Sequence, residues 1–459
     1  MALLLLATGA CSSSESGTIQ LVTGGEEAGV TFAGVASLQV TWIDSSGVAH
    51  PIVDAGLPAT SIDLGSFDQG DDGMIEVTGE DADGGIVLFG SSIPTSFGAL
   101  DGIIVPIFVQ RVGAFARLPN PEENDARTFP VLAVVGGRYL FITGGLPMSS
   151  ADSTQLYDLA GLAPLSNPPT LSAPPLSLAV VESDAGDQVA DTFDDAGLTQ
   201  LDLTSGYELP GTLPTGPTAA DIAGGATIQA AGSQYIVGGT RTNGNPTSAV
   251  LKIDPAGNWS WLQLTQPRWG AAAVWIDAIG LVVLGGNPTA SGDAGAGAES
   301  TNPTGTAFVP LTNIPPDPSV SSGAATLDDK QVVLLAGGLL PDGSDPGVRV
   351  IDLSCEAPCT PKRTWTSLPM PLGWAQAFSN RSSSGPATAV YVVGSELLTQ
   401  TTRLFVLTPS AAVPPPTAAE VPTKVIHTGA SAVPSPIGPP GSLLLFGGAP
   451  EIESFVPSP

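Results

Sequence analysis

The residues that could carry chemistry in this chain are few. Its two histidines are His50 and His427, and its three cysteines are Cys11, Cys355 and Cys359. A Ser-His-Asp triad needs a histidine beside a nucleophile, and tetrahedral zinc needs four ligands. The sequence contains no G-x-S-x-G, H-E-x-x-H or G-x-x-x-x-G-K motif. We therefore expect no catalytic residue, no metal site and no cofactor.

Carboxylates are the one abundant reactive group, and they gather in two clusters. The clusters are Asp68, Asp71, Asp72, Glu80, Asp81 and Asp83, and further along Asp184, Asp187, Asp191, Asp194 and Asp195. Calcium takes six to eight oxygen ligands, and neither cluster has the D-x-D-x-D-G order of a known calcium loop. The sequence favours turn formation and solvation for both. An enzyme that uses carboxylates to act on polysaccharide is the alternative.

Cys11 ends an apolar segment, Met-Ala-Leu-Leu-Leu-Leu-Ala-Thr-Gly-Ala-Cys. This segment resembles the end of a bacterial lipoprotein signal, although Thr8 stands where Leu is usual and no positive region precedes it. The resemblance implies that residues 1–11 are a signal segment and that Cys11 is lipidated, with 12–17 as a flexible tether. A secretory signal without a lipid is the alternative. Both predict an exported protein, and the first places it in the cell envelope, anchored to the outer membrane.

Cys355 and Cys359 lie in a loop bounded by proline, with three residues between them. In an oxidising compartment this spacing favours a local disulfide. Closing so small a loop would add only about 2 kcal/mol of stability. The predicted disulfide therefore constrains this loop and adds little to the stability of the whole fold.

Charge and composition restrict the partners and the fold. The 459 residues include 14 Lys and Arg against 43 Asp and Glu, a net charge of −29. A nucleic-acid surface needs clustered cations, so nucleic acid is excluded as a partner, and membrane contact is expected through the lipid anchor alone. The 56 Gly and 44 Pro imply many turns. Because helical periodicity is also lacking, we predict an all-β chain.

Residues 18–113 show short runs in which every second residue is apolar. Examples are the runs around Val40, Val77 and Val105, and this period of two is typical of half-buried strands. Asp and Gly in the segments between the runs favour tight turns. The pattern predicts a small immunoglobulin-like β-sandwich.

From residue 114 onward, apolar runs ending in glycine recur about every 50 residues. The repeat glycines are Gly144, Gly145, Gly238, Gly239, Gly285, Gly286, Gly337, Gly338, Gly394, Gly447 and Gly448. The first gap is twice the others, which predicts a degenerate unit near Asp191 and brings the number of units to seven. We expect each glycine pair to provide a positive-φ turn and to fit where strands converge on a central channel.

These runs resemble the kelch repeat, in which an apolar run and Gly-Gly are followed by a spaced Tyr and Trp. The resemblance implies that residues 114–459 form a seven-bladed kelch-like β-propeller of four-stranded blades. The segment that ends at Pro119 matches the outer strand of other units and has no repeat before it. We predict that it completes the last blade and so removes an exposed sheet edge.

Six tryptophans fall near outer-strand positions of the repeats. They are Trp259, Trp261, Trp269, Trp275, Trp365 and Trp374. Packing between blades is the favoured interpretation, and stacking on sugar rings is the alternative. The sequence as a whole predicts a non-catalytic envelope lipoprotein that binds or scaffolds a protein or a glycan, with a purely structural spacer as a further possibility.

Overall fold

The computed structural model confirms an all-β fold. It describes residues 17–458 except 58–59, 66–71, 97–102, 122–125, 148–153, 167, 169, 172–176, 183–187, 194–196, 204, 206, 231, 242, 291–294, 303–305, 328–330, 356–367, 382–385 and 409–417, and only the backbone of 177–182 and 188. The helices within this part are α1 (Ala28–Thr31) and η3 (Ala219–Ile222). Neither is long and apolar enough to cross a membrane. The signal segment predicted at residues 1–11 lies outside the described residues, and Gly17 already belongs to the first strand.

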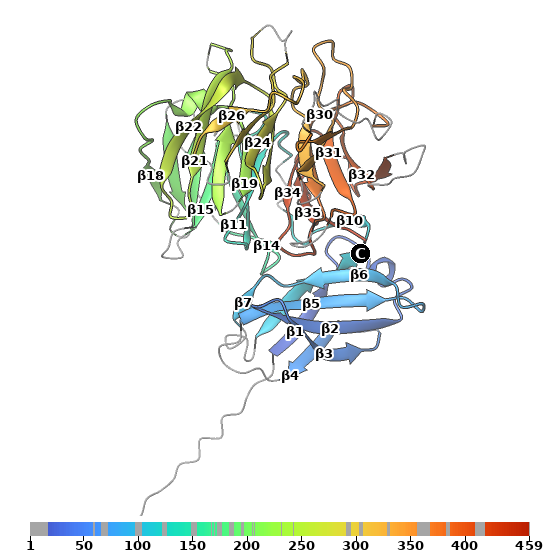
Figure 1. The fold of residues 1–459 in the computed structure, drawn as a ribbon. Coiled ribbons are helices and arrows are strands. Elements are labelled where there is room, and N and C mark those ends of the chain that lie inside the picture. The colour runs from blue at the N-terminus through green and yellow to red at the C-terminus, as the bar shows by residue number, and fades with distance from the viewer. Residues whose placement is uncertain are drawn as a thin grey trace, which may run out of the picture.

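The N-terminal region is a sandwich of two sheets (Figure 1). One sheet contains β4 (Ser61–Gly65), β1 (Gly17–Val22) and β8 (Ile104–Phe108). The other contains β3 (Ala49–Ala55), β2 (Ser37–Asp44), β5 (Asp72–Glu80), β6 (Ile86–Ser91) and β9 (Gln110–Arg111), with β7 (Thr95–Ser96) beside β5. Alternate residues such as Leu38, Val40, Ile75 and Val77 are buried between the sheets, as a period of two requires.

The strands after residue 113 form seven further sheets, which we number in chain order. Sheet 1 is β11 (Val131–Val135), β12 (Tyr139–Thr143), β13 (Gln155–Asp158) and β14 (Ala163–Pro164). Sheet 2 is β15 (Ser177–Glu182), β16 (Gln188–Phe193), β17 (Leu198–Asp202) and β18 (Glu208–Pro210). Sheet 3 is β19 (Ala226–Ala230), β20 (Ser233–Val237), β21 (Thr247–Ile253) and β22 (Trp259–Arg268).

The remaining four sheets repeat this antiparallel order. Sheet 4 is β23 (Ala272–Ile276), β24 (Gly280–Leu284), β25 (Glu299–Thr301) and β26 (Phe308–Pro310). Sheet 5 is β27 (Gly323–Thr326), β28 (Val332–Ala336) and β29 (Arg349–Asp352). Sheet 6 is β30 (Leu372–Ser379), β31 (Val390–Glu396), β32 (Thr402–Leu407) and β33 (Ala419–Val421). Sheet 7 is β34 (Ser431–Pro434), β35 (Leu443–Phe446), β36 (Glu453–Val456) and β10 (Ala114–Arg117).

The first strand of each sheet is its inner strand, and the inner strands form a closed ring. Contacts run from β11 through β15, β19, β23 and β27 to β30, and β34 contacts β11. The Gln376 side chain links β30 to β34 by hydrogen bonds to both backbone groups of Ala432, at 2.9 and 3.1 Å. Small sheets arranged in this way around an axis define a β-propeller.

Sheet 7 is built from both ends of the propeller sequence. Its outer strand β10 pairs with β36 antiparallel, with Phe115 opposite Phe455. Their rings lie 5.4 Å apart, and Tyr391 contacts Phe455 from sheet 6. The prediction that the segment before Pro119 completes the last unit is confirmed.

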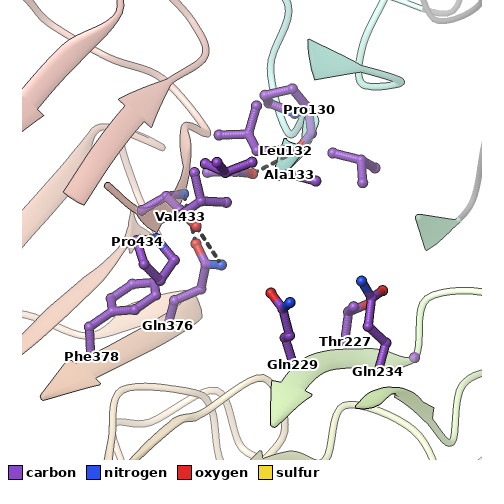
Figure 2. Close-up of a pocket in the computed structure, with 15 residues that line it drawn as sticks. Pro130, Leu132, Ala133, Thr227, Gln229, Gln234, Gln376, Phe378, Val433 and Pro434 are labelled. Carbon is purple, nitrogen blue, oxygen red and sulfur yellow. Dashed lines mark hydrogen bonds between the residues drawn. The ribbon is translucent and has the colours of Figure 1, made fainter. Parts of the chain in front are cut away.

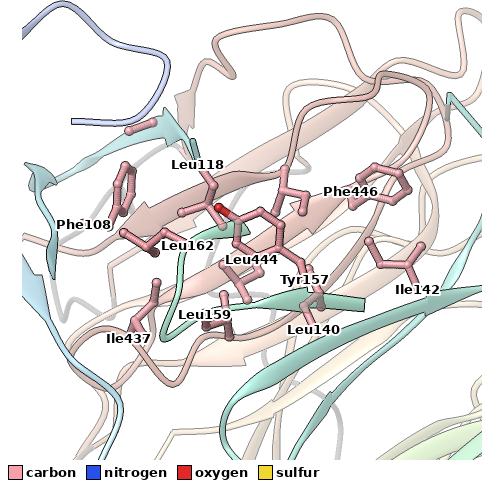
Figure 3. Close-up of a cluster of buried hydrophobic side chains, with 12 residues drawn as sticks. Phe108, Leu118, Leu140, Ile142, Tyr157, Leu159, Leu162, Ile437, Leu444 and Phe446 are labelled. Carbon is pink, nitrogen blue, oxygen red and sulfur yellow. The ribbon is translucent and has the colours of Figure 1, made fainter. Parts of the chain in front are cut away.

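The sandwich packs directly against the propeller. Phe108 of β8 shares a buried cluster with Leu118, Leu162 and Ile437 (Figure 3). Gly25 donates a backbone hydrogen bond to Arg117, and the Arg117 side chain pairs with Glu26 at 3.0 Å. Leu162 and Ile437 lie in turns after β13 and β34, so the sandwich lies against the ends of sheets 1 and 7 at which their inner strands finish.

Tyr157 provides the first testable contact, because it ties sheet 1 to the closing segment. Its ring is buried, and its hydroxyl donates a 2.6 Å hydrogen bond to the carbonyl of Pro119. We expect Tyr157→Phe to lower the free energy of unfolding by about 1 kcal/mol, because a buried carbonyl loses its donor. Urea denaturation measures the loss. Tyr207→Phe, at an exposed position, is the control and is expected to change nothing; an equal loss in both variants would contradict the assignment.

Candidate functional site

The repeat glycines lie at the opposite end of the sheets from the sandwich. Each pair follows a second strand, and φ is positive at Gly144, Gly145, Gly238, Gly239, Gly285, Gly286, Gly337, Gly338, Gly447 and Gly448. Gly394 differs, because it lies inside β31. The loops that lead into the inner strands, here called lead-in loops, meet the glycines at this end. We call it the lead-in face.

Contacts with the lead-in loops explain why these positions lack side chains. A Cβ on Gly145 would come within 2.6 Å of the Thr128 carbonyl oxygen, in the lead-in loop of its own sheet. A Cβ on Gly238 would come within 2.6 Å of the Arg268 carbonyl oxygen, at the lead-in loop of the next sheet. We expected the convergence of the strands on the channel to exclude these side chains. Packing of the glycines against the lead-in loops excludes them instead.

Two lead-in loops carry buried ionisable pairs with the same geometry. Arg268 donates to the Gly285 carbonyl at 3.1 Å and pairs with Glu299, and both side chains are fully buried. The second pair consists of His427, whose Nδ1 lies 2.8 Å from the Gly447 carbonyl oxygen, and Glu453, 3.5 Å from its Nε2. Each carboxylate also accepts two backbone N–H groups, from the end of β22 for Glu299 and from the lead-in loop of sheet 7 for Glu453. These pairs fix the loops and face no solvent, which favours a structural role for His427.

A residue with positive φ stands two positions before the inner strands of sheets 1, 3, 4, 5 and 7, and another stands inside the inner strand of sheet 6. The first five are Phe129, Gly224, Gly270, Ser321 and Gly429, and the sixth is Trp374 in β30, two positions before Gln376, where pairing resumes after a bulge. Glycine adopts this conformation without cost, whereas a bulky residue is strained by roughly 1–3 kcal/mol. Two aromatic residues therefore occupy positions at which three other sheets have glycine.

Phe129 and Trp374 contact each other across the intervening sheet 7. Their ring centroids are 4.9 Å apart, and the planes are inclined by 55°. Gly429 packs against Phe129, because a Cβ on Gly429 would come within 2.9 Å of the Phe129 ring. The Phe129 N–H also donates a 2.6 Å hydrogen bond to the Gly429 carbonyl. Trp374 nevertheless keeps 55% of its surface exposed. We call Phe129 and Trp374 the aromatic pair.

The aromatic pair lies at the lead-in ends of the inner strands β11 and β30, which we call the channel mouth. Pro130 and Gln376, which follow its members, line a cavity of about 440 Å³ between the inner strands (Figure 2). Gln229 and Gln234 lie across this cavity from Pro130. None of the described lining residues carries a charge: they are Pro130, Val131, Leu132, Ala133, Val134, Gly225, Thr227, Gln229, Gln234, Gln376, Phe378, Ser431, Ala432, Val433 and Pro434.

Exposed aliphatic residues extend this surface along the lead-in face. Leu146, Leu398 and Ile426 are exposed in loops at this face, in sheets 1, 6 and 7, the sheets whose lead-in ends carry Phe129, Trp374 and Gly429. Backbone hydrogen bonds join these loops, since Gly429 donates to the carbonyl of Gln400 and Leu146 pairs with Thr128. The loops that carry these exposed residues are therefore joined to one another through their backbones.

The acidic clusters do not form a common site in the described residues. Asp81 follows β5 and accepts hydrogen bonds from the backbone N–H groups of Asp83 and Gly85 in its own turn. Asp72 lies at the other end of β5, as its first residue. Asp191 is fully buried in β16, and Asp184, Asp187, Asp194 and Asp195 lie outside the described residues. No group of three or more His, Cys, Asp and Glu that could hold a metal occurs among the residues that the structure describes.

Burial of Asp191 gives it unusual acid-base behaviour. Its Oδ1 accepts a hydrogen bond from Gln200 at 2.9 Å, but its Oδ2 accepts none from the described residues. Desolvation raises the pKa of Asp191 to about 7, although the Gln200 bond opposes the shift. With an exposed fraction of 0%, the carboxyl cannot reach a substrate.

Other residues singled out in the sequence are far from this mouth or outside the described part. Cys355 is disulfide-bonded, while Cys359 and Cys11 lie outside the described residues, so the Cys355–Cys359 pairing and the lipidation stay predictions. His50 contacts Asp44 in the sandwich. Trp259, Trp261 and Trp275 pack between sheets as expected. Trp374 does not, because it lies at the bulge near the start of β30 and is largely exposed.

The aromatic pair was missed because sequence periodicity emphasised the glycine pairs. A second alignment reveals it: Arg268-Trp-Gly-Ala and His427-Thr-Gly-Ala share a spacing with Arg127-Thr-Phe-Pro. Arg127 donates to the Gly144 carbonyl, as Arg268 does to that of Gly285. An aromatic residue at the third position of this pattern is the signal that identifies Phe129.

This chain is thus a β-propeller with a small sandwich before it and an aromatic pair at its channel mouth. No family model and no curated protein matches it. Among solved structures it is similar to "Structure of YjhT", at 12% identity and a TM-score of 0.41, over 66% of this chain and 99% of that one. It is also similar to "Dihydro-heme d1 dehydrogenase NirN in complex with DHE", at 12% identity and a TM-score of 0.38, over 88% and 77%. Likenesses this low say nothing about function.

Proposed function

We propose that this protein is a non-catalytic binding module, which holds a protein or a glycan of the cell envelope at the channel mouth on its lead-in face. The observation that carries the proposal is the aromatic pair. Two bulky residues in left-handed conformations persist only where the surrounding structure enforces them, and such strain is concentrated at functional sites. Trp374 is largely exposed although its ring also contacts Phe129.

The arrangement of the domains supports this proposal. The sandwich covers one end of the propeller, and the aromatic pair lies at the other. A lipid on Cys11 would therefore hold the sandwich toward the outer membrane and leave the lead-in face accessible. The exposed residues Leu146, Leu398 and Ile426 add apolar area of the kind that marks interaction sites.

We also propose that sheets 1 to 7 are the blades of a seven-bladed kelch-like propeller. The glycine pairs, the ring of inner strands and Tyr157 in the third strand of sheet 1 support this assignment. The immunoglobulin-like label for the sandwich rests on its two-sheet core alone.

The enzyme alternative has less support. The one member of the second acidic cluster that the structure describes, Asp191, is buried away from solvent. The spacer alternative leaves the strained and exposed Trp374 unexplained.

Substitution of Trp374 separates a binding module from a spacer. We expect Trp374→Ala to weaken retention of the purified protein on isolated envelope fractions by about tenfold, as removal of a central aromatic anchor does. Co-sedimentation measures the retention. Tyr207→Ala removes an even more exposed aromatic residue from the outer edge of sheet 2 and is expected to leave the retention unchanged. Equal retention of both variants would contradict the proposal.

A further inference from the structure

Resting on the proposed function, we infer that the channel mouth binds an uncharged glycan, with one sugar ring stacked on the indole of Trp374 and its hydroxyl groups directed to the polar groups of the channel. Three properties of the site lead to this ligand class: the neutrality of the cavity, the fixed amide of Gln376, and the open face of the indole.

The neutrality of the cavity selects against charged ligands. In a chain with a net charge of −29, the described lining residues include no acid. They include no Lys or Arg either, and recognition of carboxylate, sulfate or phosphate relies on such cations. A charged group that entered the cavity would lose its hydration without gaining a partner there.

The polar groups of the cavity select against a purely apolar ligand. Thr227 and Gln229 are exposed to the channel, and an apolar ligand would leave them without hydrogen bonds. The Gln376 amide is held by Ala432 at both its oxygen and its nitrogen. Each of these atoms keeps one further hydrogen-bonding position, so the amide is oriented before a ligand arrives and can meet a hydroxyl group as donor or acceptor.

The aromatic pair supplies the apolar part of the site. A pyranose ring has a flat face of C–H groups and an edge of hydroxyl groups. The Trp374 indole is a flat apolar surface that is 55% exposed, and Gln376, two residues further on, lines the polar cavity. Together they match these two features. Phe129 supports the indole from the side, and the missing side chain of Gly429 leaves the space that Phe129 occupies. The cavity volume of about 440 Å³ is within the range of small-ligand sites.

Affinity electrophoresis with known polysaccharides tests the ligand class. Native gels would contain a neutral polymer, namely dextran, mannan, laminarin or hydroxyethyl cellulose, or the anionic polymers polygalacturonate and hyaluronan. We expect at least one neutral polymer to retard the protein, and Trp374→Ala to raise the dissociation constant about tenfold or more. Tyr207→Ala should behave as wild type. Retardation by the anionic polymers alone, or unchanged retardation of Trp374→Ala, would overturn the inference.

A second variant tests the geometry without removing either ring. Gly429→Ala places a methyl group against Phe129 and should displace the aromatic pair, so binding to the neutral polymer should weaken while near-ultraviolet circular dichroism changes. Gly343→Ala is the matched control, because it also has positive φ but meets no atom within 4 Å. Equal binding by the two variants would contradict the assigned geometry.

Treated envelope fractions distinguish failure of this inference from failure of the proposed function. Periodate destroys sugar rings that carry vicinal hydroxyl groups, whereas proteinase K removes protein. Loss of Trp374-dependent retention after periodate but not after proteinase supports the glycan. The reverse result overturns the glycan and leaves the binding module in place. Retention that never depends on Trp374 overturns both.

Discussion

An Arg268→Met variant is expected to unfold with a free energy about 3–5 kcal/mol lower than wild type, because it leaves the Glu299 carboxylate buried without its cation. Both side chains are fully buried, and Arg268 also donates to the Gly285 carbonyl. The loss therefore affects the lead-in loop of sheet 4 as well as the ion pair. Guanidinium denaturation followed by near-ultraviolet circular dichroism measures it.

The size of this effect depends on burial, which a second ion pair tests. Arg138 forms two 2.8 Å hydrogen bonds with Asp158, but its side chain is 43% exposed. Arg138→Met is therefore expected to cost no more than about 1 kcal/mol. Adding Glu299→Gln to Arg268→Met should restore part of the lost stability, since the buried charge is then removed. Similar losses for Arg268→Met and Arg138→Met would show that burial is not the cause.

Asp191→Asn is the second substitution with a large expected effect, and its sign depends on pH. The pKa of Asp191 is raised to about 7 in the folded protein, against about 3.9 in an unfolded chain. The folded state therefore holds a proton that the unfolded state releases. Stability from this group is fully present below pH 4 and is lost as the pH rises to 7. Asparagine cannot ionise and avoids that loss.

We therefore expect the stability of Asp191→Asn relative to wild type to increase by about 4 kcal/mol between pH 4 and pH 8, at about 1.4 kcal/mol per unit of pKa shift. The contributions of the other titrating groups to the pH dependence cancel in the difference between the two proteins. Denaturation series at several pH values measure the difference. Asp54→Asn, at an exposed sandwich position, is the control and should give no such trend. A constant difference for Asp191→Asn would show that the carboxyl is ionised throughout.

Much of the fold was predictable because its determinants are local and repeated. A period of two marks the strands around Val40 and Val77, and the glycine pairs mark the ends of second strands. The segment around Phe115 indicated the partner of β36 because it matched the outer strand of other units and had no repeat before it, while the last unit was one strand short. The second strand of sheet 2, Gln188–Phe193, was not identified, since its sequence is polar and has no glycine pair after it.

The candidate site was less predictable, because it depends on neighbours far apart in sequence. Phe129 and Trp374 lie in sheets 1 and 6 and meet only when the ring is closed. Trp374 looked like the outer-strand tryptophans in sequence, and only the register of β30 reveals its different place. Burial of Asp191 was equally hidden, since an aspartate among others suggests solvation when only the sequence is considered.

The pairing of β10 with β36 has a consequence for biogenesis. The residues of β10 leave the ribosome more than 300 positions before those of β36, so during synthesis this strand remains an open edge that can pair wrongly with other chains. A nascent chain that stops before residue 453 lacks β36 and cannot complete sheet 7. Protection of the β10 edge therefore depends on the last strand of the chain.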